Sequence, residues 1–251
     1  MLPRPLPVSA ADFGDTLWRA ADLVGPAGAT VASGHAALDA QLPGGGWPLG
    51  AISEILQAQS GQHEWRLLLP ALTRVAAGPV LLVGAPHVPF GPGLWAQGFD
   101  AHRLLWIRPA TPDARLWAAE QALRCASVAA VLVWLAQVRA EQLRRLQIAA
   151  QAHGKLLFVM RPAQARAESS PAVLRLLVAS RPMALQATDA AISEDALLVQ
   201  ILKRRGSPLD QLLALAARPA RLAALLAIHA GPAPLSSPGS GDALDCTAAT
   251  A

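Results

Sequence analysis

The sequence predicts an α/β fold in which a mostly parallel sheet is covered by helices on both faces. Over residues 31–207, short apolar runs alternate with longer stretches of helical periodicity. The short runs are apolar throughout, as expected of strands that are buried on both faces. Hydrophobic residues make up 53% of the 251 residues and charged residues 15%, so the chain can fill a sizeable core and leaves a sparsely charged surface.

The predicted elements follow one another in the order that such a sheet requires. Residues 1–30 form a lead-in with a short helix near residues 12–23, for which Asp12 is the expected N-cap. The expected strands are residues 51–56, 78–83, 104–107, 128–135, 156–160 and 197–202. The expected helices between them are residues 67–77, 113–125 and 141–153.

The C-terminal part has a different composition. Residues 208–230 are rich in alanine and leucine and predict a helical segment that is broken at Pro219. Residues 231–251 are of low complexity and predict a disordered tail. The predicted α/β domain therefore ends at residue 207.

Several classes of protein are disfavoured by composition. Cys125 and Cys246 are far apart and suggest free thiols of a cytoplasmic protein. The proline-broken N-terminus lacks the apolar core of a signal peptide, and the longest apolar run, residues 126–136, is about half of a membrane span. No two of the six histidines have metal-site spacing, so no metal site is expected. No cofactor is expected either.

The basic residues and the tryptophans suggest contacts with other molecules. The positive charge is concentrated in residues 121–225, which is compatible with nucleic acid or with an acidic partner. Lys203, Arg204 and Arg205 either contact such a ligand or simply end a strand in solvent. Trp47 follows three glycines and is expected to be exposed. Together with Trp65 and Arg66 it is a candidate partner contact.

The most informative segment is residues 31–69. It has a glycine-rich turn at residues 42–46, a Pro-Leu-Gly lead-in to the first strand, and a small polar loop before a helix. This arrangement resembles the RecA family, in which a glycine-rich loop ending in Gly-Lys-Ser/Thr binds the phosphates of ATP. The resemblance implies a RecA-like core and a vestigial phosphate loop.

The loop departs from the ATP-binding pattern at the residues that matter most. Gly61 and Gln62 are followed by His63, where the family has lysine, and by Glu64, where it has a hydroxyl. A neutral histidine lacks the fixed charge of lysine, and a carboxylate repels phosphate. We therefore expect Glu64 to stabilise the start of the helix by filling the place of the phosphate.

Three further positions of the family pattern are also changed. The second strand runs into residues 84–87 without the acid that orients water in the ATPases of this family, and Trp134 stands where an aspartate would hold magnesium. Met160 and Arg161 replace the glutamine that senses the terminal phosphate. These changes predict a protein that is not an enzyme, although a weak ATPase with an unusual loop remains an alternative.

The segment Glu-Trp-Arg-Leu-Leu-Leu-Pro-Ala-Leu at residues 64–72 and the late residues 202–206 are similar to the ImuA family. The resemblance implies an accessory protein of damage-induced (SOS) translesion DNA synthesis and mutagenesis. Its partners would be ImuB, a catalytically inactive relative of the Y-family polymerases, and an error-prone replicative-type polymerase. Contact with DNA is compatible with the sequence, and it is expected to be indirect, through these partners.

Two alternatives share the same degenerate fold. One is an inhibitor of cell division of the SulA family, which acts by binding FtsZ. The other is a modulator of RecA that reuses the contact surface between RecA subunits.

Overall fold

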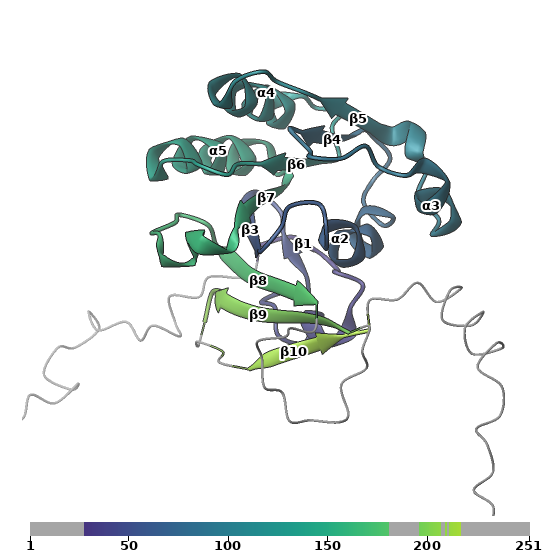
Figure 1. Cartoon of the computed structure of the whole chain (residues 1–251), viewed down its shortest axis with the longest axis vertical. Helices are drawn as coiled ribbons and strands as arrows, with labels where there is room; N and C mark the ends of the chain where they lie inside the picture. The colour runs from purple at the N-terminus through teal and green to yellow at the C-terminus, as the bar shows by residue number, and fades with distance from the viewer. Residues whose placement is uncertain (1–27, 181–195, 207–208, 210, 217–251) are drawn as a thin grey trace, which may run out of the picture. The chain divides into compact units, whose positions relative to one another are not determined.

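A mixed sheet lies at the centre of the computed structural model, which describes residues 28–180, 196–206, 209 and 211–216 (Figure 1). In the described chain the sheet has eight strands in the order β10-β9-β8-β3-β7-β6-β4-β5. The six strands from β8 to β5 are parallel, whereas β9 and β10 are antiparallel to their neighbours. The strands are β3 (Ala51–Gln57), β4 (Val80–Val83), β5 (Leu104–Ile107), β6 (Ala130–Trp134), β7 (Leu156–Pro162), β8 (Leu174–Ser180), β9 (Leu197–Lys203) and β10 (Leu212–Leu215).

Helices cover both faces of this sheet, and the predicted α/β fold is thereby confirmed. Helix α2 (Glu64–Leu72) packs into one hydrophobic cluster together with α3 (Gly91–Ala96), while α4 (Pro112–Arg124) and α5 (Ala140–His153) pack into the other. Shorter elements complete the described fold: α1 (Ala36–Asp39), the two-stranded pair β1 (Thr30–Val31) and β2 (Trp47–Pro48), and the 3-10 helices η2 (Ala101–Arg103) and η3 (Ala163–Ala167).

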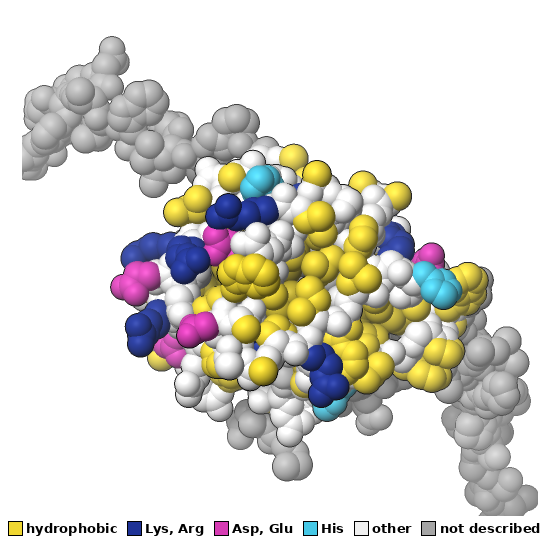
Figure 2. All heavy atoms as spheres, turned by 90° about the horizontal axis from the view of Figure 1, so that it is seen from above, with side chains coloured by type: hydrophobic (Ala, Val, Ile, Leu, Met, Phe, Trp, Pro, Cys, Tyr) yellow, Lys and Arg dark blue, Asp and Glu magenta, His cyan; other side chains and the backbone are white. Residues whose placement is uncertain are grey.

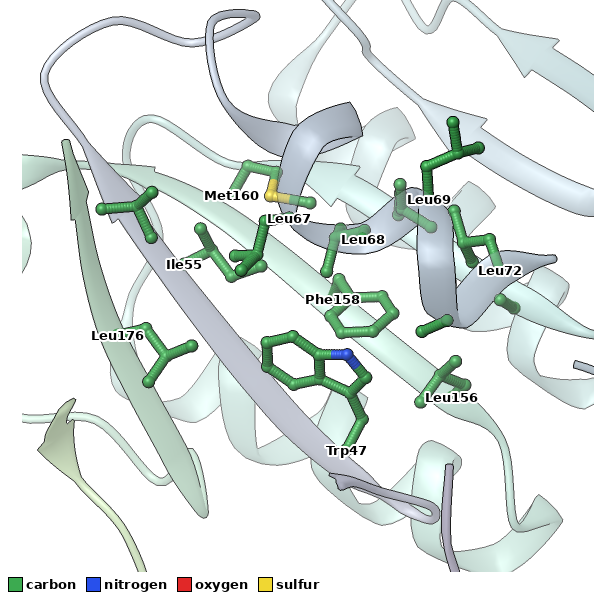
Figure 3. Packing of buried hydrophobic residues seen from close by; sticks show 14 of the residues in the cluster. Trp47, Ile55, Leu67, Leu68, Leu69, Leu72, Leu156, Phe158, Met160 and Leu176 are labelled. Carbon is green, nitrogen blue, oxygen red and sulfur yellow. The ribbon is translucent and has the colours of Figure 1, made fainter. Parts of the chain in front are cut away.

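Strand β3 lies between β7 and β8, and all seven of its residues are buried. On the α2 side of the sheet, Trp47 packs edge-to-face against Phe158 with ring centroids 5.1 Å apart, surrounded by Ile55 and leucines of α2 (Figure 3). Trp47 is fully buried, so the expectation that it is exposed is wrong. Gly44 and Gly45 have positive φ angles and turn the chain so that β2 pairs with β1, which brings the indole into the core.

Most of the predicted elements exist with shifts of a few residues at their ends. Helix α2 starts three residues earlier than predicted and ends at Leu72, and the hydroxyl of Thr73 then donates to the carbonyl of Pro70. The predicted helix over residues 208–230 is wrong at residues 212–215, which form β10 and extend the sheet beyond residue 207. The helix near residues 12–23 and the tail of residues 231–251 lie outside the described residues.

The parallel strands determine where a site can form. Strands β3, β4, β6 and β7 all point the same way, so the loops that follow them meet at one edge of the sheet. In open parallel sheets this carboxyl edge is the usual place for a binding site.

Candidate functional site at the carboxyl edge of the sheet

The 57–64 loop connects β3 to α2 at this edge, and its centre is the carboxylate of Glu64. Glu64 is the first residue of α2 and is only 1% exposed. Its Oε1 accepts hydrogen bonds from the side-chain amide of Gln57 (2.5 Å), the backbone N–H of Gly61 (2.6 Å) and the indole N–H of Trp134 (2.9 Å). Its Oε2 accepts from the backbone N–H of His63 at 3.1 Å.

This carboxylate therefore holds the loop closed around the N-terminus of a helix. Backbone N–H groups and the helix dipole at such a position favour negative charge. Here the negative charge belongs to the chain itself, and the amides of Gly61 and His63 are already bonded to it. The indole of Trp134, at the end of β6, adds a donor that comes from a different strand of the sheet.

Close packing around Gly61 fixes the shape of the loop. Gly61 has a φ of 96°, and a Cβ atom at this position would lie 2.4 Å from the ring of His87. A side chain here would be strained by the backbone and would collide with the ring. The residues that follow β4 thus pack against the loop without contributing an acidic group to it, while Gln62 remains exposed.

His63 precedes the helix and is buried, and its Nδ1 atom has no hydrogen-bond partner in the described structure. Burial lowers the pKa of His63, and the nearby positive charge of Arg66 lowers it further against the opposing effect of Glu64. Burial likewise lowers the pKa of His35, which hydrogen-bonds the carbonyl of Leu67 through Nε2. Both imidazoles are therefore neutral at pH 7.

Acid is expected to destabilise the fold through these two histidines. In the unfolded chain they titrate near their ordinary pKa of about 6.5, so below that pH the unfolded state binds more protons than the folded state. Stability is thus fully present above pH 6.5 and falls as the pH decreases, by at most about 1.4 kcal/mol per pH unit for each histidine. Urea unfolding of wild type and of His63→Gln between pH 7 and pH 5 measures this. An equal slope for both proteins would contradict the assignment to His63.

The structure places the other predicted contact residues apart from the 57–64 loop or only partly at the surface. Trp65 is half-buried and packs against the core, and Arg66 is half-exposed. The ammonium of Lys203 donates to the carbonyl of Ser170 at 2.9 Å, and the guanidinium of Arg204 donates to the carbonyl of Gln41. Arg205 is exposed and lines a cavity of about 370 Å³ near the start of β3.

A buried network of charges lies on the face of the sheet opposite α2 and was not foreseen from the sequence. Glu54 of β3 is fully buried and accepts from Arg161 of β7 at 3.2 Å and from Arg175, which lies directly opposite on β8. Arg161 also pairs with Glu168 at 2.6 Å, and Arg175 donates to the carbonyl of Ala165 at 2.8 Å. Arg161 is thus part of a structural network of buried ion pairs. The signal that could have revealed it is three charged residues inside otherwise apolar strands.

Two further findings concern the described part of the chain. It contains no helix that is long and apolar enough to cross a membrane. It also contains no group of three or more His, Cys, Asp and Glu side chains that could hold a metal ion.

Fold and loop together define an α/β protein whose strand–loop–helix turn, at the carboxyl edge of a mostly parallel sheet, is closed by its own glutamate. Comparison with known proteins relates the chain to two named groups. It is 33% identical over 150 residues to Protein ImuA of two strains of Caulobacter vibrioides, covering 55% of this chain and 60% of that protein. It is 34% identical over 103 residues to the cell division inhibitor SulA of Edwardsiella piscicida, covering 40% of this chain and 61% of that protein.

These similarities confirm the predicted relationship to ImuA and SulA. The chain matches about three-fifths of the length of these relatives. No family model matches the chain.

Proposed function

We propose that this protein is a non-catalytic, RecA-like accessory factor of DNA-damage-induced mutagenesis, which acts through contacts with other proteins. Three-fifths of an ImuA protein aligns with it at 33% identity, which supports a role in the response to DNA damage. The observation that carries the non-catalytic part is the carboxylate of Glu64, because it takes up the N–H groups that a phosphate would need.

In this proposal the 57–64 loop is a vestigial phosphate loop. An incoming phosphate would have to displace Glu64 from four hydrogen bonds and would meet its charge at close range. Neutral His63 would not offset that repulsion. The partners that the ImuA resemblance implies are an ImuB-type polymerase homologue and an error-prone replicative-type polymerase. RecA and DNA remain further candidates.

Titration of the full chain with magnesium-ATP in a calorimeter is expected to show no binding heat, and the nucleotide is expected to leave the melting temperature unchanged. The reason is the occupied loop, in which Glu64 replaces the phosphate. RecA serves as the positive control under the same conditions. Micromolar binding that is lost in His63→Ala would contradict the proposal and would favour a nucleotide-dependent protein.

Co-expression of the full chain with the ImuB-type protein of the same genome tests the partner directly. We expect the two proteins to copurify through affinity and size-exclusion steps, and we expect deletion of the gene to reduce mutation frequency after ultraviolet irradiation. Absence of both copurification and an effect on mutation frequency would contradict the proposed role.

The similarity to SulA supports a second candidate, an inhibitor of cell division that binds FtsZ. Overproduction would then cause filamentous cells, and purified FtsZ would form a complex with the protein. Filamentation without any effect on induced mutagenesis would favour this alternative.

A further inference from the structure

A second feature of the carboxyl edge is a cavity of about 390 Å³ beside the 57–64 loop. It lies where β4, β5, β6 and β7 end, and Ser60 of the loop forms part of its wall. Two arginines, Arg108 and Arg115, also line it. None of its described lining residues is aspartate or glutamate. Neither guanidinium therefore has a carboxylate partner among the described residues that line the cavity.

Arg115 is fixed in this cavity by the backbone around it. Its Nη1 atom donates to the carbonyl of Trp134 at 2.9 Å, whereas its Nε atom is buried and has no partner in the described structure. The guanidinium lies against Gly84, where a Cβ atom would come within 2.4 Å of Nε. A guanidinium held in this way keeps its positive charge at the wall of the cavity, where a bound anion would interact with it.

Arg108 supplies the second positive charge at the surface. Its guanidinium stacks on the ring of Trp106 at 5.0 Å from the centroid, which restricts the side chain without neutralising it. Arg108 is exposed, and Arg115 is half-buried. One cation therefore lies at the mouth of the cavity and the other within it.

Apart from the two arginines and Ser60, the described lining residues are glycine or apolar, although polar and apolar atoms share the exposed wall about equally. Pro86 and Leu135 are among the apolar lining residues. Outside the cavity lining, Val88, Phe90 and Trp117 are 69%, 74% and 64% exposed. Figure 2 views the end of the molecule that carries α3, β5 and α4 in Figure 1, and hydrophobic side chains gather across the middle of this face. Large exposed apolar patches of this kind mark interaction sites.

We propose that the cavity receives the carboxylate of an aspartate or glutamate from an apolar segment of a partner protein. The two arginines would bind the carboxylate, and apolar lining residues such as Pro86 and Pro109 would contact the side chains beside it. A small inorganic anion would leave the apolar surface exposed. Two cations among prolines and aliphatic side chains suit a peptide better than the repeated phosphates of DNA, which call for a longer basic track. The inference rests on the proposed function only in that both involve protein contacts.

Selection of random twelve-residue peptides on the immobilised full chain tests this site without any polymerase subunit. We expect the enriched peptides to contain an acidic residue flanked by apolar residues. Fluorescence anisotropy of the best labelled peptide is expected to show at least about tenfold weaker binding to Arg115→Gln, because a charge-assisted hydrogen bond is lost. Arg108→Gln is expected to weaken binding less, since this side chain is exposed.

Two controls keep the outcome clear. Arg124→Gln removes a largely exposed arginine on α4 that pairs with Glu120. This variant is expected to leave peptide binding unchanged. Should Arg115→Gln fail to fold, Ala136→Glu places a carboxylate at an exposed lining position and is expected to block the peptide.

Three results would overturn the cavity proposal: no enriched peptide, enriched peptides without acidic residues, or equal affinity for wild type and Arg115→Gln. Binding of a single-stranded oligonucleotide that Arg115→Gln abolishes would instead identify DNA as the ligand. Each of these results leaves copurification with the ImuB-type protein untouched, so the two proposals can fail separately.

Discussion

Glu54→Gln is expected to lower the free energy of unfolding by about 3–5 kcal/mol. The substitution keeps the shape of the side chain but removes the charge that faces both Arg161 and Arg175, and all three residues are buried. Arg161 retains Glu168, whereas Arg175 keeps only backbone carbonyls as partners in the described structure. An uncompensated buried charge costs far more than the loss of a pair at the surface.

Urea unfolding followed by circular dichroism measures this effect. The matched control is Glu120→Gln, which also removes a glutamate that pairs with two arginines, Arg124 and Arg145. Because both arginines of the control are largely exposed, we expect it to cost less than about 1 kcal/mol. If the two variants lost the same stability, the buried network would not hold β3, β7 and β8 together as we infer.

A simultaneous replacement of Glu54, Arg161 and Arg175 by apolar residues of similar volume separates charge from packing. Removing all the partners of a buried network leaves no charge unpaired, and such replacements are often neutral or stabilising. We therefore expect the triple variant to be more stable than Glu54→Gln alone.

Glu64→Ala is expected to cost about 3 kcal/mol, since it takes away the acceptor of four N–H donors in and around the 57–64 loop. Glu64→Gln keeps one carbonyl oxygen and is expected to cost less. The control is Glu141→Ala, in the first turn of α5, where an exposed glutamate contributes through the helix dipole alone and about 1 kcal/mol at most.

Glu64→Ala also tests whether the 57–64 loop can bind an anion. With the carboxylate gone, the amides of Gly61 and His63 become available to an anion. Millimolar phosphate is therefore expected to raise the melting temperature of Glu64→Ala more than that of wild type, at constant ionic strength. Equal effects on both proteins would argue against Glu64 as a substitute for phosphate.

The parts of the fold that depend on local pattern could be predicted, and those that depend on distant pairing could not. Strand β5 has the predicted bounds because its apolar run lies between polar residues. Strand β8 escaped prediction because Arg175 interrupts its apolar run, and its charge makes sense only opposite Glu54. Strand β10 has a helical composition, and pairing with β9 overrides that preference.

The candidate site shows the same division. That Glu64 stands at a helix N-terminus could be inferred from the spacing of a few residues. Its bonds to Gln57 and Trp134 could not, because Trp134 is seventy positions further along the chain. The cavity with Arg108 and Arg115 depends on four strand ends at once and has no local signature in the sequence.

Because the carboxylate of Glu64 is tethered to the loop that it closes, its effective concentration there is constant. Under the proposed function, no nucleotide has to be bound for this edge of the sheet to take its shape. A change in the ratio of ATP to ADP is then expected to leave the 57–64 loop unaltered.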